Sequence, residues 1–116
     1  MSQHKGEIWL VRLDPTIGAE IGKTRPVVVV SADRIGVLPL KVIVPITSWQ
    51  DRFKVMPWMI RLDPSEENGL RNVSAADTFQ VSSVSELRFV AKLGRISDLE
   101  IQTIAEALSL VLDIQS

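Results

Sequence analysis

The 116-residue sequence contains no cysteine, no tyrosine and a single histidine. Without cysteine, disulfides and thiolate metal sites are excluded. One histidine cannot supply both the acid and the base of a two-histidine mechanism, and His4, near the start of the chain, is a poor base for a hydrolase triad. The carboxylates are scattered, and Glu66 and Glu67 lie in a turn-like polar stretch. We therefore expect no bound metal and no cofactor.

Long apolar runs are also missing. No stretch approaches the roughly 18 residues that a membrane-spanning helix needs. The first five residues, Met1 to Lys5, are polar and lack the apolar segment of a signal peptide. No Gly-x-Ser-x-Gly elbow, phosphate-binding loop or dinucleotide fingerprint is present. The sequence therefore predicts a cytoplasmic protein without a membrane segment.

Neither sign of charge is in large excess, since 13 basic residues face 14 acidic ones for a net charge of −1. A protein that coats nucleic acid non-specifically depends on many phosphate contacts, so this balance argues against that class. A net charge near zero is still compatible with a local basic cleft. The length and the 46% content of hydrophobic residues fit one domain, residues 1–116, with its own core.

The pattern along the chain is many short strands followed by one helix. The predicted strands cover residues 7–14, 26–31, 40–47 and 55–63, with two or three more within 73–84 and 89–93. The apolar β-branched run Pro26 to Ser31 predicts a central strand that is buried on both faces. Pro45 suggests that the third strand lies at an edge or carries a bulge. Residues 15–24 contain Gly18 and Gly22 and predict a mobile loop.

The helix has the clearest local signals. Ser97 and Glu100 form a capping-box pattern at its start. Apolar residues then recur at helical spacing, and this stripe must pack against the sheet. The stripe comprises Ile101, Ile104, Leu108 and Val111, with Ala105 and Leu112 beside them. We therefore predict a mainly β fold with a C-terminal helix, in which the sheet is strongly bent or forms a small barrel.

Arg25 follows the glycine-containing loop and precedes the buried strand, so its side chain emerges at a strand end. A guanidinium binds a phosphate with two parallel hydrogen bonds and stays charged. The alternative is an ordinary ion pair with Glu20 or Asp14.

Other polar residues also interrupt apolar context. Thr47 and Ser48 end the third strand and offer two hydroxyls to a phosphate, or they cap a turn. Asp77 can accept a proton and Gln80 can hold a nucleobase edge, or both lie on an exposed strand face.

The three tryptophans, Trp9, Trp49 and Trp58, are the residues best suited to stacking on bases. Trp9 lies in a strongly apolar strand and is expected in the core. Trp49, beside Ser48 and Gln50, is the best stacking candidate, although a protein interface would suit it equally.

These residues occur in an order that resembles the MazF/PemK family of toxins. The resemblance covers roughly residues 6–112 and is most specific around Arg25. The matching segments are Gly6 to Thr16, Gly18-x-Glu20, Lys23-Thr24-Arg25-Pro26 to Ser31, Val42 to Ser48, Ala76-Asp77-x-x-Gln80-Val81 and Lys92 to Ile96 followed by a helix.

The resemblance implies a small SH3-like barrel of the CcdB/MazF type, usually a homodimer. It also implies metal-independent, sequence-selective cleavage of single-stranded RNA by the 2′-hydroxyl, which leaves a 2′,3′-cyclic phosphate and a 5′-hydroxyl. A MazE-like antitoxin would be the protein partner. Arg25 and Thr47 match the catalytic arginine and threonine of the family, and Glu20 is our candidate general base. The expected substrate-binding residues are Lys23, Thr24, Ser48, Trp49, Asp77 and Gln80.

The sequence departs from the family at two places. Thr24 stands where some relatives have a histidine, so a histidine role cannot carry over. Two residues separate Asp77 from Gln80, whereas we expect the acid and the glutamine to be adjacent.

Two other functions remain open. One is a gyrase poison like CcdB, although the chain lacks a tryptophan near its C-terminus. The other is a catalytically silent barrel that serves only protein contacts.

Overall fold

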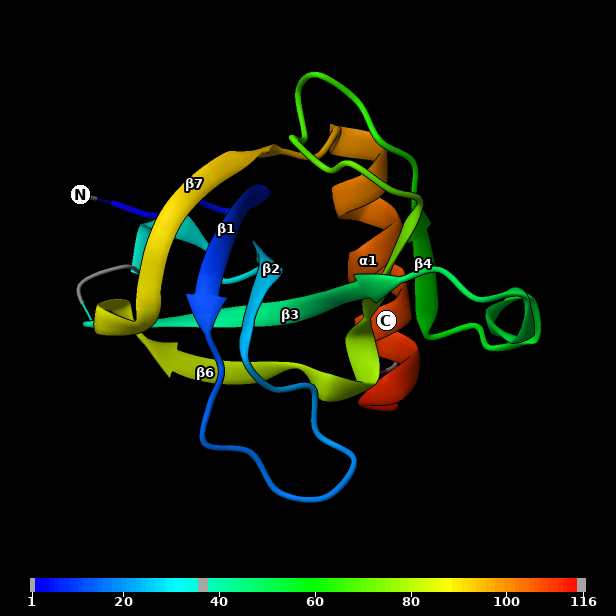
Figure 1. The fold of residues 1–116 in the computed structure, drawn as a ribbon, viewed down its shortest axis with the longest axis horizontal. Coiled ribbons are helices and arrows are strands. Elements are labelled where there is room, and N and C mark those ends of the chain that lie inside the picture. The colour runs from blue at the N-terminus through cyan, green and yellow to red at the C-terminus, as the bar shows by residue number, and fades with distance from the viewer. Residues whose placement is uncertain (1, 36–37, 115–116) are drawn as a thin grey trace.

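The structure is a computed structural model that describes residues 2–35 and 38–114. In it, short antiparallel strands curve around one side of the molecule and a single α-helix packs against the sheet (Figure 1). The elements are β1 (Glu7–Arg12), β2 (Thr24–Val29), β3 (Leu40–Ser48), β4 (Met59–Leu62), β5 (Ser74–Asp77), β6 (Ser82–Ser85), β7 (Phe89–Arg95) and α1 (Asp98–Val111). The predicted class, mainly β with a C-terminal helix, is confirmed.

The strand order is β4-β5-β3-β2-β1-β7, and β6 also pairs with β3. The long strand β3 changes partner along its length. Its first half, Leu40–Ile43, pairs with β6, and its last residues, Ile46–Ser48, pair with β5. This change of partner bends the sheet. The end strands β4 and β7 do not pair with each other within the described residues, so the sheet stays open rather than closing into a barrel.

Both faces of the central strands are buried, as the apolar run predicted. Val27, Val28 and Val29 of β2 are at most 1% exposed. One face forms a cluster around Trp9, whose ring meets Phe89 edge-on at 5.8 Å between centroids. The other face packs against Ile104 of α1. The assignment of Trp9 to the core is confirmed.

The helix begins as its sequence predicted. The Ser97 Oγ accepts from the Glu100 amide at 3.1 Å, and the Glu100 carboxylate accepts from the Ser97 amide at 2.9 Å. Ile101 and Leu108 pack against the core beside Ile104. The stripe ends before Leu112, which is 55% exposed.

The expected edge position of Pro45 and the expected start of the fourth strand were wrong. Pro45 does not lie at an edge, because β3 is central; Pro45 stands opposite Val27 and falls in the gap between the β6 and β5 pairings of β3. A proline has no N–H, and this gap is where the loss of one ladder bond matters least. The predicted fourth strand is shorter, because residues 51–55 form a 3₁₀ helix and β4 begins only at Met59.

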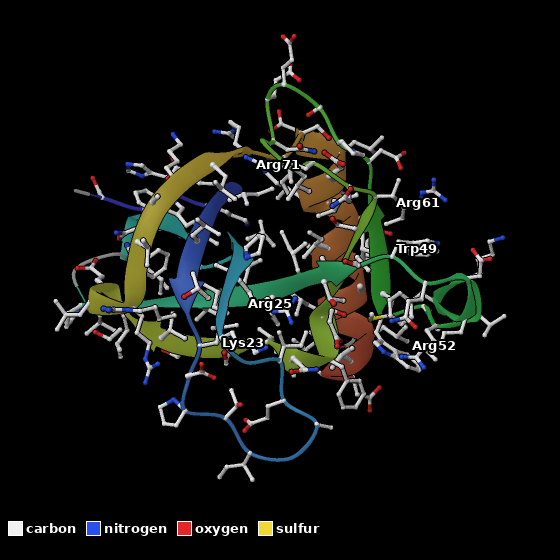
Figure 2. All side chains as sticks on the ribbon, in the orientation of Figure 1. Lys23, Arg25, Trp49, Arg52, Arg61 and Arg71 are labelled. Atoms are coloured by element: carbon white, nitrogen blue, oxygen red, sulfur yellow. The ribbon has the colours of Figure 1, made fainter. Side chains whose placement is uncertain are left out.

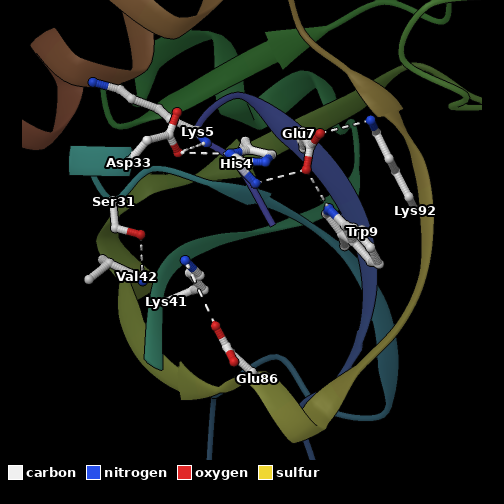
Figure 3. A network of polar contacts seen from close by, with 10 residues as sticks. All are labelled: His4, Lys5, Glu7, Trp9, Ser31, Asp33, Lys41, Val42, Glu86 and Lys92. Atoms are coloured by element: carbon white, nitrogen blue, oxygen red, sulfur yellow. Dashed lines mark hydrogen bonds and ion pairs between the residues drawn. The ribbon is translucent and has the colours of Figure 1, made fainter. Parts of the chain in front are cut away.

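Gln3, near the start of the described residues, is buried, and the segment that follows it meets a polar network (Figure 3). Glu7, only 6% exposed, accepts hydrogen bonds from the His4 amide and the Trp9 indole and forms an ion pair with Lys92 at 2.7 Å. Burial by itself raises the pKa of Glu7, but these partners outweigh it and the pKa is lowered. This buried carboxylate ties the start of the chain to β1 and β7.

Candidate active site

Arg25 and Thr47 meet on one face of two neighbouring strands. In the antiparallel register of β2 and β3, Val27 lies opposite Pro45. Arg25 lies two residues before Val27, and Thr47 lies two residues after Pro45, so each falls on the same face of its strand as that residue. Both residues line one cavity of about 350 Å³. The fold therefore places the two residues that the resemblance assigns to catalysis beside the same cavity.

The Arg25 guanidinium has donors to spare. Its Nε donates to the Gly22 carbonyl at 3.3 Å, which aims the side chain toward the loop between β1 and β2. Arg25 forms no ion pair within the described parts of the chain, so the alternative of a salt bridge with Glu20 or Asp14 is not what the structure contains. Its side chain is half-buried, and Figure 2 shows it emerging from β2 near the middle of the molecule.

Thr47 and Ser48 belong to β3 and do not cap a turn. They pair with Ala75 and Ser74 of β5. A cavity of about 350 Å³ is lined by Arg25, Thr47 and Ser48 at the ends of their strands. Thr47 also lines a neighbouring cavity of about 310 Å³ together with Asp77 and Gln80. Thr47 therefore connects the arginine side of the site to the acid and the glutamine.

Asp77 and Gln80 are adjacent in space although two residues separate them in the sequence. Residues Thr78–Gln80 form a 3₁₀ turn, and Asp77 caps it by accepting from the Phe79 amide at 3.1 Å. This turn brings Gln80 Nε2 within 3.1 Å of the second carboxylate oxygen of Asp77. Asp77 and Gln80 are therefore neighbours in space, although they are not adjacent in the sequence as we expected.

A larger cavity of about 820 Å³ shares Asp77 and Gln80 with the previous one. The aromatic side chains of Trp58 and Phe79 line this larger cavity, and their rings meet edge-on at 5.9 Å between centroids. Phe79 is 64% exposed. Trp58 is one of the three tryptophans named from the sequence as candidates for stacking on bases. Phe79 was missed, and the available signal for it was its place between the two polar residues. The arrangement offers a flat, partly apolar chamber beside polar groups, which suits a nucleobase.

Glu20 lines the same large cavity from the loop between β1 and β2. It is exposed, and its carboxylate accepts from the Ile17 amide within the same loop. Glu20 therefore borders the large cavity with Asp77 and Gln80, and the lining of that cavity does not include Arg25 or Thr47.

Lys23 and Thr24 face a different hollow. They line a cavity of about 520 Å³ with Arg12 and Arg88. These two arginines were not among the site residues expected from the sequence. Lys23 has a left-handed backbone, with φ of 64°. The structure therefore does not bring Lys23 and Thr24 into the cavities that Thr47 lines.

Trp49 lies beyond the end of β3 and lines none of these cavities. Its ring meets Phe53 edge-on at 5.6 Å, and the Arg61 guanidinium lies 5.5 Å from its centroid. Figure 2 shows Trp49 and Arg61 beside β4, with Arg52 below them. Arg52 in turn lies 5.4 Å from the Phe53 ring and lines the cavity that Thr47 shares. These two arginines were also missed. The contact of Arg61 with Trp49 joins residues that are twelve positions apart in the sequence, and the place of Arg52 in the cavity wall depends on the fold.

Neither a metal-ligand cluster nor a membrane span occurs within residues 2–35 and 38–114. In these ranges, no group of three or more histidine, cysteine, aspartate or glutamate side chains is placed to hold a metal ion. No helix in the same part of the chain has the length and apolar character needed to cross a membrane.

The chain is similar to known proteins over nearly its whole length. A family model described as "PemK-like, MazF-like toxin of type II toxin-antitoxin system" matches residues 4–112. Endoribonuclease MazF9 of Mycobacterium tuberculosis is 36% identical over 118 aligned positions, which cover 97% of this chain and 98% of that protein. Endoribonuclease PemK of Escherichia coli is 43% identical over 60 positions, about half of each chain.

Solved structures agree in fold. A crystal structure of MazF from Deinococcus radiodurans superposes with a TM-score of 0.78 at 22% identity, covering 97% of both chains. A mycobacterial endoribonuclease in complex with its cognate antitoxin superposes with a TM-score of 0.77 at 16% identity, covering 99% of both chains.

Proposed function

The chain belongs to the PemK-like, MazF-like family of toxins of type II toxin–antitoxin systems, and we propose that it is an endoribonuclease that cleaves single-stranded messenger RNA without a metal ion. Cleavage at selected sequences would arrest translation and growth. The single observation that carries the proposal is the cavity that Arg25 and Thr47 line together, with the guanidinium forming no ion pair within the described residues.

The reaction builds negative charge on the phosphoryl oxygens. The 2′-oxygen of the RNA attacks the adjacent phosphorus, a new P–O2′ bond forms and the P–O5′ bond breaks. The products are a 2′,3′-cyclic phosphate and a 5′-hydroxyl. Arg25 and Thr47 would donate to the oxygens where the charge develops, which is the kind of contact that lowers the barrier.

Two proton transfers accompany these bond changes. The attacking 2′-hydroxyl loses a proton, and the leaving 5′-oxygen gains one. We assign the first transfer to Glu20, whose carboxylate lies at the rim of the large cavity. Its present contact with the Ile17 amide is internal to the loop and exposed, so it is weak enough to exchange for substrate.

The remaining polar residues would hold the RNA on either side of the cleaved phosphate. Ser48 is an exposed hydroxyl beside Thr47. Asp77 borders the chamber that suits a base, and Gln80 shapes the wall of that chamber through its hydrogen bonds to Asp77 and to the Ile21 amide. Trp49, with Arg61 against its ring, offers a stacking surface beyond the strand end. Lys23 and Thr24 line a separate hollow with Arg12, Arg88 and Asp14. Its three basic side chains outnumber its one carboxylate, so this hollow would suit a flanking phosphate.

The proposed partners are a MazE-like antitoxin and a second copy of this chain, as in a homodimer. The antitoxin is supported by the mycobacterial relative, which was solved in complex with its cognate antitoxin. Because the proposed substrate is messenger RNA, the proposed location is the cytoplasm. A gyrase poison is not favoured, since the curated relatives are named endoribonucleases.

The direct experiment incubates the purified protein with a mixed-sequence RNA and with DNA of the same sequence, both in EDTA. The proposal expects cleavage of RNA only, and loss of cleavage in Arg25→Ala. Arg34→Ala is the matched control, because Arg34 is exposed on a short 3₁₀ helix outside all of these cavities. Cleavage that requires added magnesium, or no cleavage at all, would contradict the proposal.

A further inference from the structure

The tip of the loop between β1 and β2 is attached to the rest of the molecule at few points. We call residues 16–22 the loop tip. Within the described parts of the chain, it makes two hydrogen bonds to residues outside the loop. The Ile21 amide donates to Gln80 Oε1 at 2.8 Å, and the Gly22 carbonyl accepts from Arg25 Nε at 3.3 Å. Both attachments go to residues of the candidate site.

The Gln80 amide is held in one orientation. Its Nε2 donates to Asp77 Oδ2 at 3.1 Å, and the other Asp77 oxygen accepts from the Phe79 amide. An ionised carboxylate only accepts hydrogen bonds, so the NH₂ end of Gln80 must face Asp77 and the oxygen must face the loop. Asp77 therefore sets which end of Gln80 is offered to the Ile21 amide.

The two attachments are next to each other in the chain. Gly22 directly follows Ile21, and its carbonyl belongs to the peptide unit that ends in the Lys23 amide, which donates to Asp14 Oδ1 at 2.8 Å. Gln80, through the Ile21 amide, and Asp14, through the Lys23 amide, therefore limit from both sides where the Gly22 carbonyl can point. The free part of the guanidinium can then point at a phosphate without searching other rotamers. Such orientation before the reaction is a major source of rate.

We propose that Gln80 is a positioning residue that holds the loop tip in place, so that Gly22 can orient the Arg25 guanidinium. This inference rests on the proposed function for its effect on cleavage, but the loop attachment itself does not. It also gives Gln80 a role other than reading a base, because both polar atoms of its amide are already engaged within the protein.

A paired exchange of side chains separates positioning from direct RNA contact. In the double variant Asp77→Asn with Gln80→Glu, the asparagine amide introduced at position 77 can donate to the glutamate carboxylate introduced at position 80. That carboxylate can still accept from the Ile21 amide, the Phe79 amide keeps its acceptor, and the net charge is unchanged. Each single exchange instead breaks the pattern, because Gln80→Glu sets two carboxylates against each other and Asp77→Asn removes one acceptor.

The first measurement is hydrogen exchange at the Ile21 amide in the RNA-free protein. Gln80→Met should exchange about tenfold faster than wild type, as expected for the loss of one ordering hydrogen bond, and the paired exchange should restore protection. Gln102→Met is the matched control, because Gln102 lies exposed on α1. Unchanged exchange at Ile21 in Gln80→Met would overturn the proposal. This readout is valid even if the protein proves to have no nuclease activity.

The second measurement is cleavage under single turnover, beside binding of an RNA with a 2′-deoxy sugar at the cleaved position. Gln80→Met should lower the cleavage rate constant by roughly tenfold while RNA binding changes by less than about threefold, and the paired exchange should recover most of the rate. If Ile21 protection returns in the paired exchange but cleavage does not, or if base preference changes, Gln80 contacts RNA directly and the proposal is wrong. Circular dichroism and thermal melting of every variant confirm folding.

Discussion

Replacing Arg25 by lysine isolates what the guanidinium does. The substitution keeps the positive charge and removes the planar fork of five N–H donors. In the structure, Arg25 Nε donates to the Gly22 carbonyl. The other guanidinium N–H groups form no ion pair with a carboxylate within the described residues. A lysine ammonium at this position cannot hold Gly22 and grip two phosphoryl oxygens at once.

The expected loss follows from those missing donors. Removing one donor to transition-state charge typically costs about 10²- to 10³-fold in rate, or about 2.7–4 kcal/mol. Arg25→Lys should therefore lose at least about 10²-fold and come within roughly tenfold of Arg25→Ala. The loss should fall on the cleavage rate constant, since a lysine retains most of the charge that attracts RNA.

The assay is single-turnover cleavage of a labelled oligonucleotide, with binding measured separately on a 2′-deoxy analogue. Arg34→Lys is the control for a general change from arginine to lysine at an exposed position. If Arg25→Lys stays within about threefold of wild type, Arg25 supplies only general positive charge and the reasoning about its fork is refuted.

Three further results are expected. Glu20→Gln should slow cleavage by about 10²-fold or more at saturating RNA, because it removes the proposed base, and a change of less than about twofold would remove Glu20 from that role. The pKa of Glu7 is lowered from 4.5 on folding, so its stabilisation is present above about pH 4.5 and is lost as pH falls through the folded pKa. Denaturant melts should therefore show Glu7→Gln less stable than wild type at neutral pH, with the difference shrinking as the pH is lowered below 4.5, and a constant difference would contradict this. An acidic antitoxin peptide should compete with uncleavable RNA, and Arg25→Ala should weaken both; a peptide that binds RNA-saturated protein unchanged would place the inhibitory site elsewhere.

Local patterns predicted those elements whose cause is local. The run of valines in β2 needs burial on both faces wherever it lies, and Ser97 with Glu100 caps a helix from within a single turn. The position of Pro45 was misjudged because its tolerance comes from β3 changing partners, which depends on where β5 and β6 arrive.

In the site, too, some features follow from the local sequence and others depend on distant parts of the chain. Arg25 and Thr47 were identified from strand ends and resemblance, and the folded chain places both in the lining of one cavity. The contact between Asp77 and Gln80 depends on a 3₁₀ turn, which the two residues between them do not predict. Phe79 and Arg61 were not singled out, since only the folded chain places Phe79 in the cavity wall and Arg61 against Trp49.

The central claim is that this chain cleaves RNA through the 2′-hydroxyl next to the broken bond. The most direct measurement uses one oligonucleotide that the protein cuts at a mapped position, compared with the same oligonucleotide carrying a single 2′-deoxy sugar there, both in EDTA. The account predicts that the all-RNA strand yields a 2′,3′-cyclic phosphate and a 5′-hydroxyl by mass spectrometry, and that the single substitution abolishes cutting at that position. Cutting of the substituted strand at the same bond, or a 5′-phosphate on the product, would contradict it.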